Sequence, residues 1–222
     1  MSEKDALKMD YLVKNIQFGE RIFRLKKVKN LDALVDQISD ELFAEDERLP
    51  YWAELWPSAI GLSRFLMRNP ALIKNKRVLE LGVGLGLTSL VIQSLEPQTL
   101  LLTDYETEAL QVTAENFLLN GFERPEVQLL DWRNPQLNGL YDCIVASDVL
   151  YEERFFRPLI LLFKNFLAGD GRVIIAEPNR AIARKFFKML MDFGFFYDFT
   201  IIPVVQDGKT IQVHNYVIKR KK

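Results

Sequence analysis

The sequence predicts a three-layer α/β/α fold in which a mostly parallel β-sheet lies between helices. From Ala59 onward, short apolar segments typical of buried strands alternate with segments of helical periodicity, as in parallel strands joined by crossover helices. The last two apolar segments instead flank Asp207-Gly208, a strong hairpin signal, and must therefore be antiparallel to each other. A seven-stranded sheet that ends in an antiparallel C-terminal hairpin is expected.

The individual elements follow from the apolar runs and the residues that interrupt them. Strands are expected over residues 77–81, 100–103, 127–130, 143–146, 172–176, 195–205 and 210–219. Helices are expected over residues 59–66, 85–94, 106–119, 155–167 and 180–193. Asn120-Gly121 resembles a helix C-cap, and a turn at Gly169 and Asp170-Gly171 is expected to separate helix 155–167 from the next strand.

Residues 1–49 are expected to form an extension of the domain that residues 50–222 build. A β-hairpin is predicted between residues 11 and 27 around Gly19-Glu20, and its apolar positions are Ile16, Phe18, Ile22, Phe23 and Leu25. Residues 31–38 have weak helical periodicity, and the acidic segment 39–48 is expected to be solvated.

Composition narrows the classes of function. The chain has 222 residues, of which 49% are hydrophobic, and this length fits one domain with one active site. A formal net charge of −1 provides no global positive field, so nucleic acid is not an expected partner. The single cysteine, Cys143, and the single histidine, His214, exclude an internal disulfide and a Cys/His metal cluster, and no metal site is expected.

The N-terminus is charged, and no apolar run follows it as in a secretory signal. No apolar segment approaches membrane-spanning length either. We therefore expect a monomeric, cytoplasmic protein without a membrane partner.

A glycine-rich turn, Gly82-Val83-Gly84 with Gly86, follows the first strand of the expected α/β unit and lets the backbone approach a ligand closely. Its third glycine comes one residue earlier than in the G-x-G-x-x-G turn that binds dinucleotides. Glu80, two residues before the turn, would repel a pyrophosphate but would suit a ligand with a cationic amino-acid end. The turn therefore predicts S-adenosylmethionine as the cofactor and S-adenosylhomocysteine as its product.

Polar and aromatic residues follow the next two strands. Asp104, with Tyr105 after it, ends the second strand, where a carboxylate can accept both hydroxyl hydrogens of a ribose. Asp131-Trp132 follows the third strand and offers a carboxylate and an indole face to an adenine. The glycine turn alone would also fit a tight connection without a ligand, and Trp132 alone would fit plain packing. Acids at the ends of successive strands argue against coincidence.

Three segments resemble known proteins. Residues 79–86, Leu-Glu-Leu-Gly-Val-Gly-Leu-Gly, resemble the first motif of the seven-strand class I methyltransferases, which have a Rossmann-like fold. Residues 146–151, Ala-Ser-Asp-Val-Leu-Tyr, resemble the D-x-x-Y motif of the family 16 protein methyltransferases. Residues 50–59 are similar to that family's tryptophan-containing segment, and within the family the likeness is to the electron-transfer-flavoprotein β-subunit lysine methyltransferases.

This resemblance implies the roles of particular residues and the class of acceptor. The residues implied to contact the cofactor are Trp56, Gly82, Gly84, Asp104, Trp132 and Ser147. Asp148 and Tyr151 are implied to border the pocket for the methyl acceptor, which would be a side-chain amine of a protein substrate, a lysine first of all. The motif after the fourth strand is not the N/D-P-P-Y/F of enzymes that methylate base amines or glutamine amides.

We expect Asp148 to accept a hydrogen bond from the incoming amine and Tyr151 to pack against its aliphatic stem. Asp148 would also fit a helix N-cap after the fourth strand, and Tyr151 would fit a simple wall residue. Two other functions stay open: a small-molecule N- or O-methyltransferase with residues 1–50 as its lid, and a non-catalytic S-adenosylmethionine-binding protein that regulates or assembles partners. Residues 177–179 lie at the same expected edge, where they shape either the substrate pocket or only their loop.

Overall fold

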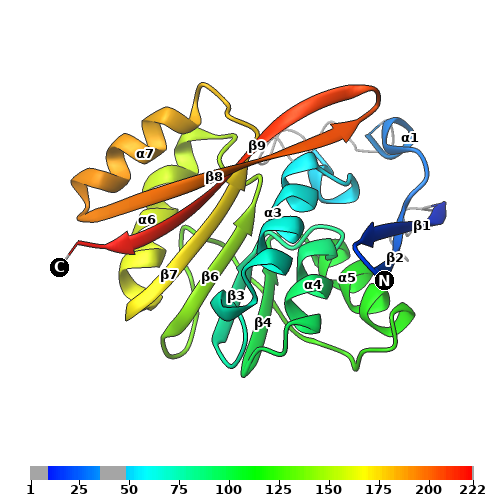
Figure 1. The fold of residues 1–222 in the computed structure, drawn as a ribbon, viewed down its shortest axis with the longest axis horizontal. Helices are drawn as coiled ribbons and strands as arrows, with labels where there is room; N and C mark the ends of the chain where they lie inside the picture. The colour runs from blue at the N-terminus through cyan, green and yellow to red at the C-terminus, as the bar shows by residue number, and fades with distance from the viewer. Residues whose placement is uncertain (1–9, 36–48, 222) are drawn as a thin grey trace, which may run out of the picture.

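The computed structural model describes residues 10–35 and 49–221, so the acidic segment 39–48 lies outside the described residues. A seven-stranded sheet has the order β5-β4-β3-β6-β7-β9-β8 (Figure 1). Its strands are β3 (Arg77–Leu81), β4 (Thr99–Asp104), β5 (Glu126–Leu129), β6 (Tyr141–Ser147), β7 (Leu167–Glu177), β8 (Phe195–Gln206) and β9 (Lys209–Arg220). Strands β3 to β7 pair in parallel, whereas β9 is antiparallel to both β7 and β8. The predicted sheet and its C-terminal hairpin are confirmed.

Helices cover both faces of the sheet. They are α1 (Leu31–Val35), α3 (Pro57–Arg68), α4 (Leu87–Ser94), α5 (Thr107–Leu119), α6 (Phe156–Phe166) and α7 (Ala183–Asp192), with short 3₁₀ turns η1 (Tyr51–Ala53), η2 (Pro70–Leu72) and η3 (Glu153–Phe155). Successive residues of a strand point to opposite faces, so Val78 packs in the cluster with α3, α4 and α5, while Leu79 packs in the cluster with α6 and α7. This arrangement is the predicted three-layer fold.

Two turns show how local sequence sets the sheet. Asp207 and Gly208 have φ angles of 50° and 73°, as a two-residue hairpin turn requires. The turn expected at residues 169–171 does not form, because β7 already begins at Leu167, directly after α6. Tyr141 pairs with Leu167 and Cys143 with Arg172, so an irregularity in the ladder absorbs the extra residues of β7.

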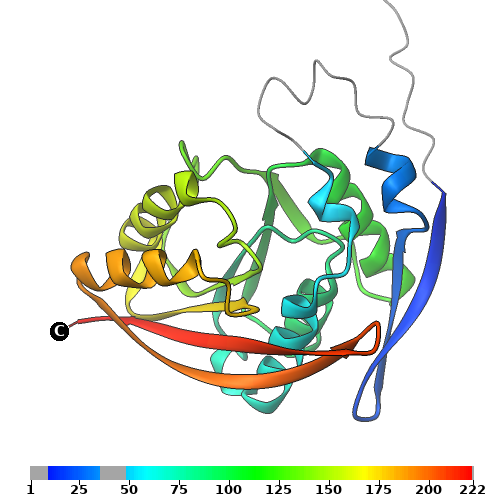
Figure 2. The same cartoon turned by 90° about the horizontal axis from the view of Figure 1, so that it is seen from above.

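An N-terminal hairpin of β1 (Tyr11–Phe18) and β2 (Arg21–Val28) packs beside α5, on the side of the sheet away from α6 and α7 (Figure 2). Four of its predicted apolar positions are buried in the same cluster as α3 and α4: Ile16, Phe18, Phe23 and Leu25. Ile22 is the exception, since 56% of it is exposed. The strand alternates, and Phe23 and Leu25 take the inward face, so their neighbour Ile22 must point outward.

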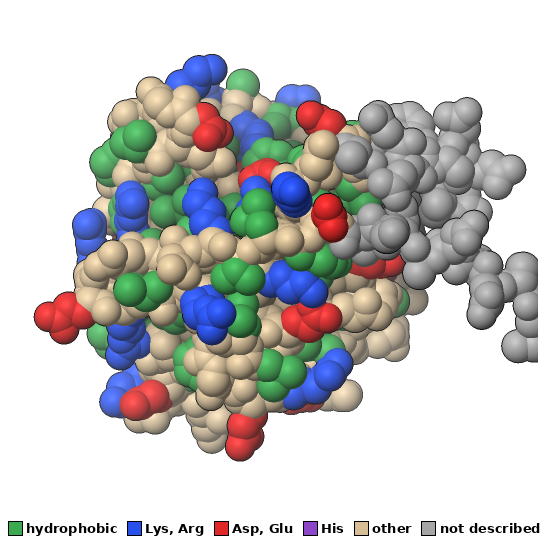
Figure 3. Space-filling model, turned by 90° about the vertical axis from the view of Figure 1, so that its right-hand side faces the viewer, with side chains coloured by type: hydrophobic (Ala, Val, Ile, Leu, Met, Phe, Trp, Pro, Cys, Tyr) green, Lys and Arg blue, Asp and Glu red, His purple; other side chains and the backbone are tan. Residues whose placement is uncertain are grey.

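Surface charges of both signs are mixed. On the face shown in Figure 3, the basic and acidic side chains of the described residues are interspersed with apolar ones. Within residues 10–35 and 49–221, no helix is long and apolar enough to cross a membrane.

Candidate active site

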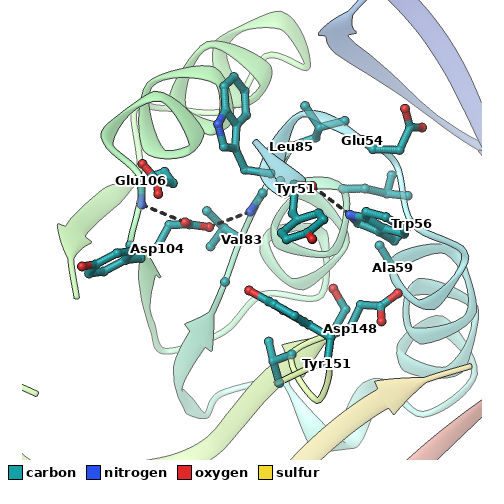
Figure 4. Close-up of a pocket in the computed structure, with 18 of the residues that line it drawn as sticks. Tyr51, Glu54, Trp56, Ala59, Val83, Leu85, Asp104, Glu106, Asp148 and Tyr151 are labelled. Atoms are coloured by element: carbon teal, nitrogen blue, oxygen red, sulfur yellow. Dashed lines mark hydrogen bonds between the residues drawn. The ribbon is translucent and has the colours of Figure 1, made fainter. Parts of the chain in front are cut away.

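A cavity lies at the carboxyl ends of β3, β4 and β6, and the segment around η1 forms its opposite wall (Figure 4). Crevices at the carboxyl ends of parallel strands are the usual ligand sites of such sheets. Residues that the sequence predicted to contact the cofactor or the acceptor line it: Trp56, Gly82, Val83, Gly84, Gly86, Asp104, Tyr105, Asp131, Trp132, Ser147, Asp148 and Tyr151. The fold therefore gathers segments that are far apart in the sequence.

The glycine turn needs glycines for steric reasons. Gly82, Gly84 and Gly86 have φ angles of 67°, 53° and 79°, which residues other than glycine rarely adopt. A Cβ on Gly86 would lie 2.8 Å from the side chain of Thr113 on α5, and one on Gly84 would lie 3.3 Å from the carbonyl oxygen of Trp52. The Thr113 hydroxyl also donates a hydrogen bond to the Gly84 carbonyl at 3.0 Å. The backbone conformation of the turn and its close packing on Trp52 and Thr113 therefore both require glycine.

Asp104 anchors this turn from the end of β4. Its Oδ2 accepts a hydrogen bond from the Gly84 N–H, and its Oδ1 accepts one from the Glu106 N–H, both at 3.0 Å (Figure 4). Burial raises the pKa of the Asp104 carboxyl, and these backbone hydrogen bonds oppose the rise. A third backbone donor, the Tyr105 N–H, acts in the same direction, so about one of the carboxylate's four acceptor positions is left for a ligand hydroxyl.

Glu80 is buried and does not line the cavity. Its side chain is buried, with 1% of the residue exposed, and it is not part of the cavity lining. Burial raises the pKa of its carboxyl to about 8, while the neighbouring hydroxyl of Ser89 acts in the opposite direction. The Oε2 atom of Glu80 is buried without a hydrogen-bond partner among the described residues, and the predicted contact between Glu80 and a cationic ligand stays a prediction.

Tyr105, Asp131 and Trp132 form the edge of the cavity near the ends of β4 and β5. The Asp131 carboxylate forms an ion pair with Arg133 at 2.8 Å, and Arg133 also donates to the Tyr105 hydroxyl at 2.9 Å. The Trp132 ring meets Phe155 edge-on at 5.6 Å between centroids. Its Nε1 atom is buried and has no hydrogen-bond partner among the described residues, so this indole presents an unused donor within the site.

Aromatic side chains of residues 50–56 close the other side. The Trp56 indole donates a hydrogen bond to the Tyr51 carbonyl at 2.8 Å, and the rings of Tyr51 and Tyr151 lie 5.4 Å apart. Burial raises the pKa of the Tyr151 hydroxyl, which is therefore neutral at physiological pH. Figure 4 shows Tyr51, Trp56, Asp148 and Tyr151 on one side of the cavity and Asp104 on the other. The sequence singled out Trp56 but not Tyr51, although the same segment carries both.

Asp148 leaves β6 in a left-handed conformation, with a φ of 59°, and its N–H donates to the Ala176 carbonyl at 2.8 Å. It does not cap a helix, because η3 and then α6 begin several residues later. The Oδ1 atom forms an ion pair with the guanidinium of Arg180, a residue that sequence reasoning missed. The Oδ2 atom is buried without a hydrogen-bond partner in the part of the chain that the structure describes.

A second hollow, which we call the outer pocket, adjoins the cavity. Its lining is Leu49, Tyr51, Trp56, Asp148, Tyr151, Glu152 and Arg180. Five of these residues also line the cavity, and Asp148 and Tyr151 are among them, so both stand where the two spaces adjoin.

Sequence comparisons identify relatives of this chain. The sequence model of the lysine methyltransferase family matches residues 39–193. The electron transfer flavoprotein beta subunit lysine methyltransferase of Mus musculus is 36% identical over 132 residues, which are 59% of this chain and 51% of that protein. The calmodulin-lysine N-methyltransferase of Arabidopsis thaliana is 30% identical over 175 residues, or 74% of this chain and 57% of that protein. The chain thus spans about half the length of the curated relatives it matches.

Solved structures share the architecture. The ribosomal protein L11 methylase of Lactobacillus delbrueckii subsp. bulgaricus superposes with a TM-score of 0.59 at 24% identity, covering 72% of this chain and 77% of that one. The magnesium protoporphyrin IX methyltransferase of Synechocystis PCC 6803, solved with bound S-adenosylmethionine, has a TM-score of 0.54 at 19% identity, covering 82% and 86%. These structures establish the fold, and the family model covers most of the chain. The chain belongs to the lysine methyltransferase family.

Proposed function

We propose that this chain transfers a methyl group from S-adenosylmethionine to the side-chain amine of a lysine in a protein substrate. The observation that carries the proposal is the position of Asp148 and Tyr151, at the junction between a cavity with a glycine turn and an outer pocket. A methyltransferase must hold the acceptor atom and the methyl carbon in line, about 3–3.5 Å apart. A junction between two spaces can bring the two reactants together in this way.

The residues of the cavity fit the cofactor. Gly82, Gly84 and Asp104 line the cavity, and the remaining acceptor position of Asp104 can take a ribose hydroxyl. The unpartnered Nε1 of Trp132 provides a donor for a ring nitrogen at the adenine end. When bound, S-adenosylmethionine supplies an electrophilic methyl group on a sulfonium.

The outer pocket suits an amine on a slender aliphatic stem. A lysine amine has an unperturbed pKa near 10.4, and only its neutral form has the lone pair that a nucleophile needs. The unpartnered Oδ2 of Asp148 can accept a hydrogen bond from this amine and orient it. Tyr51, Trp56 and Tyr151 offer ring faces to the stem and exclude water from it.

A protein is the preferred substrate class. The outer pocket adjoins the cavity at Asp148, and this geometry admits a side chain while the rest of the substrate stays outside. The names of two relatives also point to protein acceptors, since one is a lysine methyltransferase of the beta subunit of electron transfer flavoprotein and the other of calmodulin.

Radiolabelled S-adenosylmethionine, incubated with the purified chain and a cell lysate, tests the proposal on a gel. The wild type should label a protein band, Asp148→Asn should label it at least about tenfold more weakly, and the exposed Asp198→Asn on β8 should match the wild type. Label found only in small molecules would favour a small-molecule acceptor. No incorporation despite tight cofactor binding would favour a non-catalytic protein.

A further inference from the structure

The geometry points to Arg180 as a positioning residue that balances the charge of Asp148 and so favours binding of the acceptor amine in its neutral form. This inference rests on the proposed function and adds to it a residue that sets the protonation state of the acceptor. Neither the D-x-x-Y motif nor the glycine turn contains Arg180, which reaches the site from the loop after β7.

The loop that carries Arg180 is built to hold it in place. The Arg180 N–H donates a hydrogen bond to Glu177 Oε2 at 2.8 Å, and the Tyr216 hydroxyl donates to Glu177 Oε1 at 3.3 Å. Glu177 is 1% exposed, and Asn179 turns the chain with a φ of 60°. A buried carboxylate and a left-handed turn therefore fix the start of this side chain, as is common where backbone strain serves a site.

The two oxygens of Asp148 are used differently. Oδ1 is paired with the Arg180 guanidinium, whereas Oδ2 is buried without a hydrogen-bond partner among the described residues. The side chain of Asp148 is 6% exposed and that of Arg180 is 32% exposed, so the pair is screened from water on the side of Asp148. An amine can consequently donate to Oδ2 while Arg180 remains on Oδ1.

The charge of the pair matters because of the chemistry of the acceptor. An unpaired carboxylate would stabilise the ammonium form of a lysine and raise the pKa of that lysine. The ammonium form has no lone pair, so such an attraction would tighten binding of the unreactive species. With Arg180 in place, the net charge of the pair is zero, and Asp148 offers a hydrogen-bond acceptor without a net negative charge.

Of the other charged and titratable groups named here around Asp148, none neutralises its carboxylate as Arg180 does. From its own segment, Tyr151 has a pKa raised by burial and Glu152 lines the outer pocket, where it pairs with Arg154. From η1, Tyr51 contributes a phenol. From β7, the pKa of Glu177 is raised by burial, and this carboxyl contacts the backbone of Arg180. From β4, Asp104 acts on Tyr151 at longer range.

Binding of a small amine tests the inference without methyl transfer. We would titrate n-butylamine into the full chain saturated with S-adenosylhomocysteine and follow tryptophan fluorescence between pH 7 and 10. Wild-type affinity, expressed per total amine, should rise with pH as the neutral form accumulates. In Arg180→Met, affinity at pH 7 should rise about tenfold and the pH dependence should flatten, because Asp148 then attracts the ammonium. Arg180→Lys should keep the wild-type profile.

Asp148→Asn should change the affinity in the opposite direction. It leaves the positive charge of Arg180 unbalanced, so n-butylamine should bind more weakly at pH 7. Every variant is first checked for wild-type affinity for S-adenosylhomocysteine and for an unchanged melting temperature. If Arg180→Met does not fold, Asp148→Asn and Arg180→Lys still decide the matter. The inference is overturned if the affinity of Arg180→Met follows the wild-type pH profile, or if Asp148→Asn binds n-butylamine at pH 7 as tightly as the wild type.

The rate of methylation separates charge balance from simple competition. The gel assay with radiolabelled S-adenosylmethionine gives this rate. The pH–rate profile of Arg180→Met should lie about one pH unit to the alkaline side of the wild-type profile, and that of Arg180→Lys should lie closer to the wild type. An unchanged profile together with tighter amine binding would mean that Arg180 only competes for the amine site. If no protein band is labelled but n-butylamine behaves as expected, the proposed function fails, and only the charge balance between Asp148 and Arg180 at an amine site is supported.

Discussion

Asp104 accepts a hydrogen bond from the backbone N–H of Gly84 at 3.0 Å, and this contact joins the end of β4 to the glycine turn that follows β3. The same carboxylate accepts the Glu106 N–H, so one buried side chain fixes the start of α5 as well. The turn that admits the cofactor is therefore positioned by a neighbouring strand and not by its own sequence alone.

Replacing Asp104 with Asn should weaken cofactor binding. An amide has one acceptor oxygen, so its NH₂ group would face one of the two N–H donors that the carboxylate now satisfies. We expect the affinity for S-adenosylhomocysteine to fall at least about tenfold, or about 1.4 kcal/mol, in isothermal titration calorimetry. Asp198→Asn, an exposed position on β8, is the matched control and should bind like the wild type. Equal affinities for the two variants would remove Asp104 from the site.

Gly86→Ala should destabilise the fold through a clash, and Gly121→Ala separates this effect from the backbone cost. Both glycines have a positive φ, 79° and 76°, but a Cβ on Gly121 meets nothing within 4 Å, whereas one on Gly86 lies 2.8 Å from Thr113. The backbone cost is about 1–2 kcal/mol at each position. Urea unfolding should show about 1–3 kcal/mol of further loss for Gly86→Ala. Equal losses would contradict the close packing of the turn on α5.

Asn116 ties the N-terminal hairpin to the glycine turn. Its Nδ2 donates to the Lys26 carbonyl at 3.0 Å and to the Leu85 carbonyl at 2.8 Å, and its Oδ1 accepts the Lys26 N–H at 2.6 Å. Asn116→Ala leaves these buried groups without partners, which should cost about 2–3 kcal/mol of unfolding free energy. Asn120→Ala removes a similar but more exposed pair of bonds to Arg24 and should cost about 1 kcal/mol or less.

The pH dependence of stability should depend on Glu80. Its pKa is raised from 4.5 to about 8 by burial, so between these values the folded state holds a proton that the unfolded state has released. Wild-type stability should therefore fall as pH rises from 5 to 8, with a contribution from this group of up to about 1.4 kcal/mol per pH unit. The amide of Glu80→Gln does not titrate. The free energy of unfolding of the variant, relative to the wild type, should therefore increase with pH over that range. A constant difference would show that Glu80 titrates normally.

Most of the fold could be predicted because its determinants are local. Apolar runs mark β3, β4 and β6, and Asp207-Gly208 marks the final hairpin, since these signals need only neighbouring residues. The turn expected at residues 169–171 failed for a non-local reason: pairing of Leu167 with Tyr141 extends β7 back to α6. Exposure of Ile22 likewise depends on which face of the hairpin meets α5.

In the candidate site, too, some residues could be predicted from local sequence and others depend on tertiary structure. Asp104 could be predicted because it ends a strand, where side chains of parallel strands converge, and Asp148 because it lies in the segment that resembles the D-x-x-Y motif. The role of Arg180 could not, because it depends on the left-handed Asn179 and on the buried Glu177 that holds the loop. The burial of Glu80 could not be predicted either, because it depends on how β3 packs against the helices.

The chemical identity of the methylated residue tests the central claim most directly. A protein band labelled by the wild-type chain and radioactive S-adenosylmethionine would be hydrolysed in acid, and its amino acids would be separated by chromatography. We predict that the label co-elutes with ε-N-methylated lysine and that Asp148→Asn greatly reduces it. Label that co-elutes with methylated arginine or histidine, or that is released by mild base as from a methyl ester, would contradict the proposal that the outer pocket receives a lysine amine.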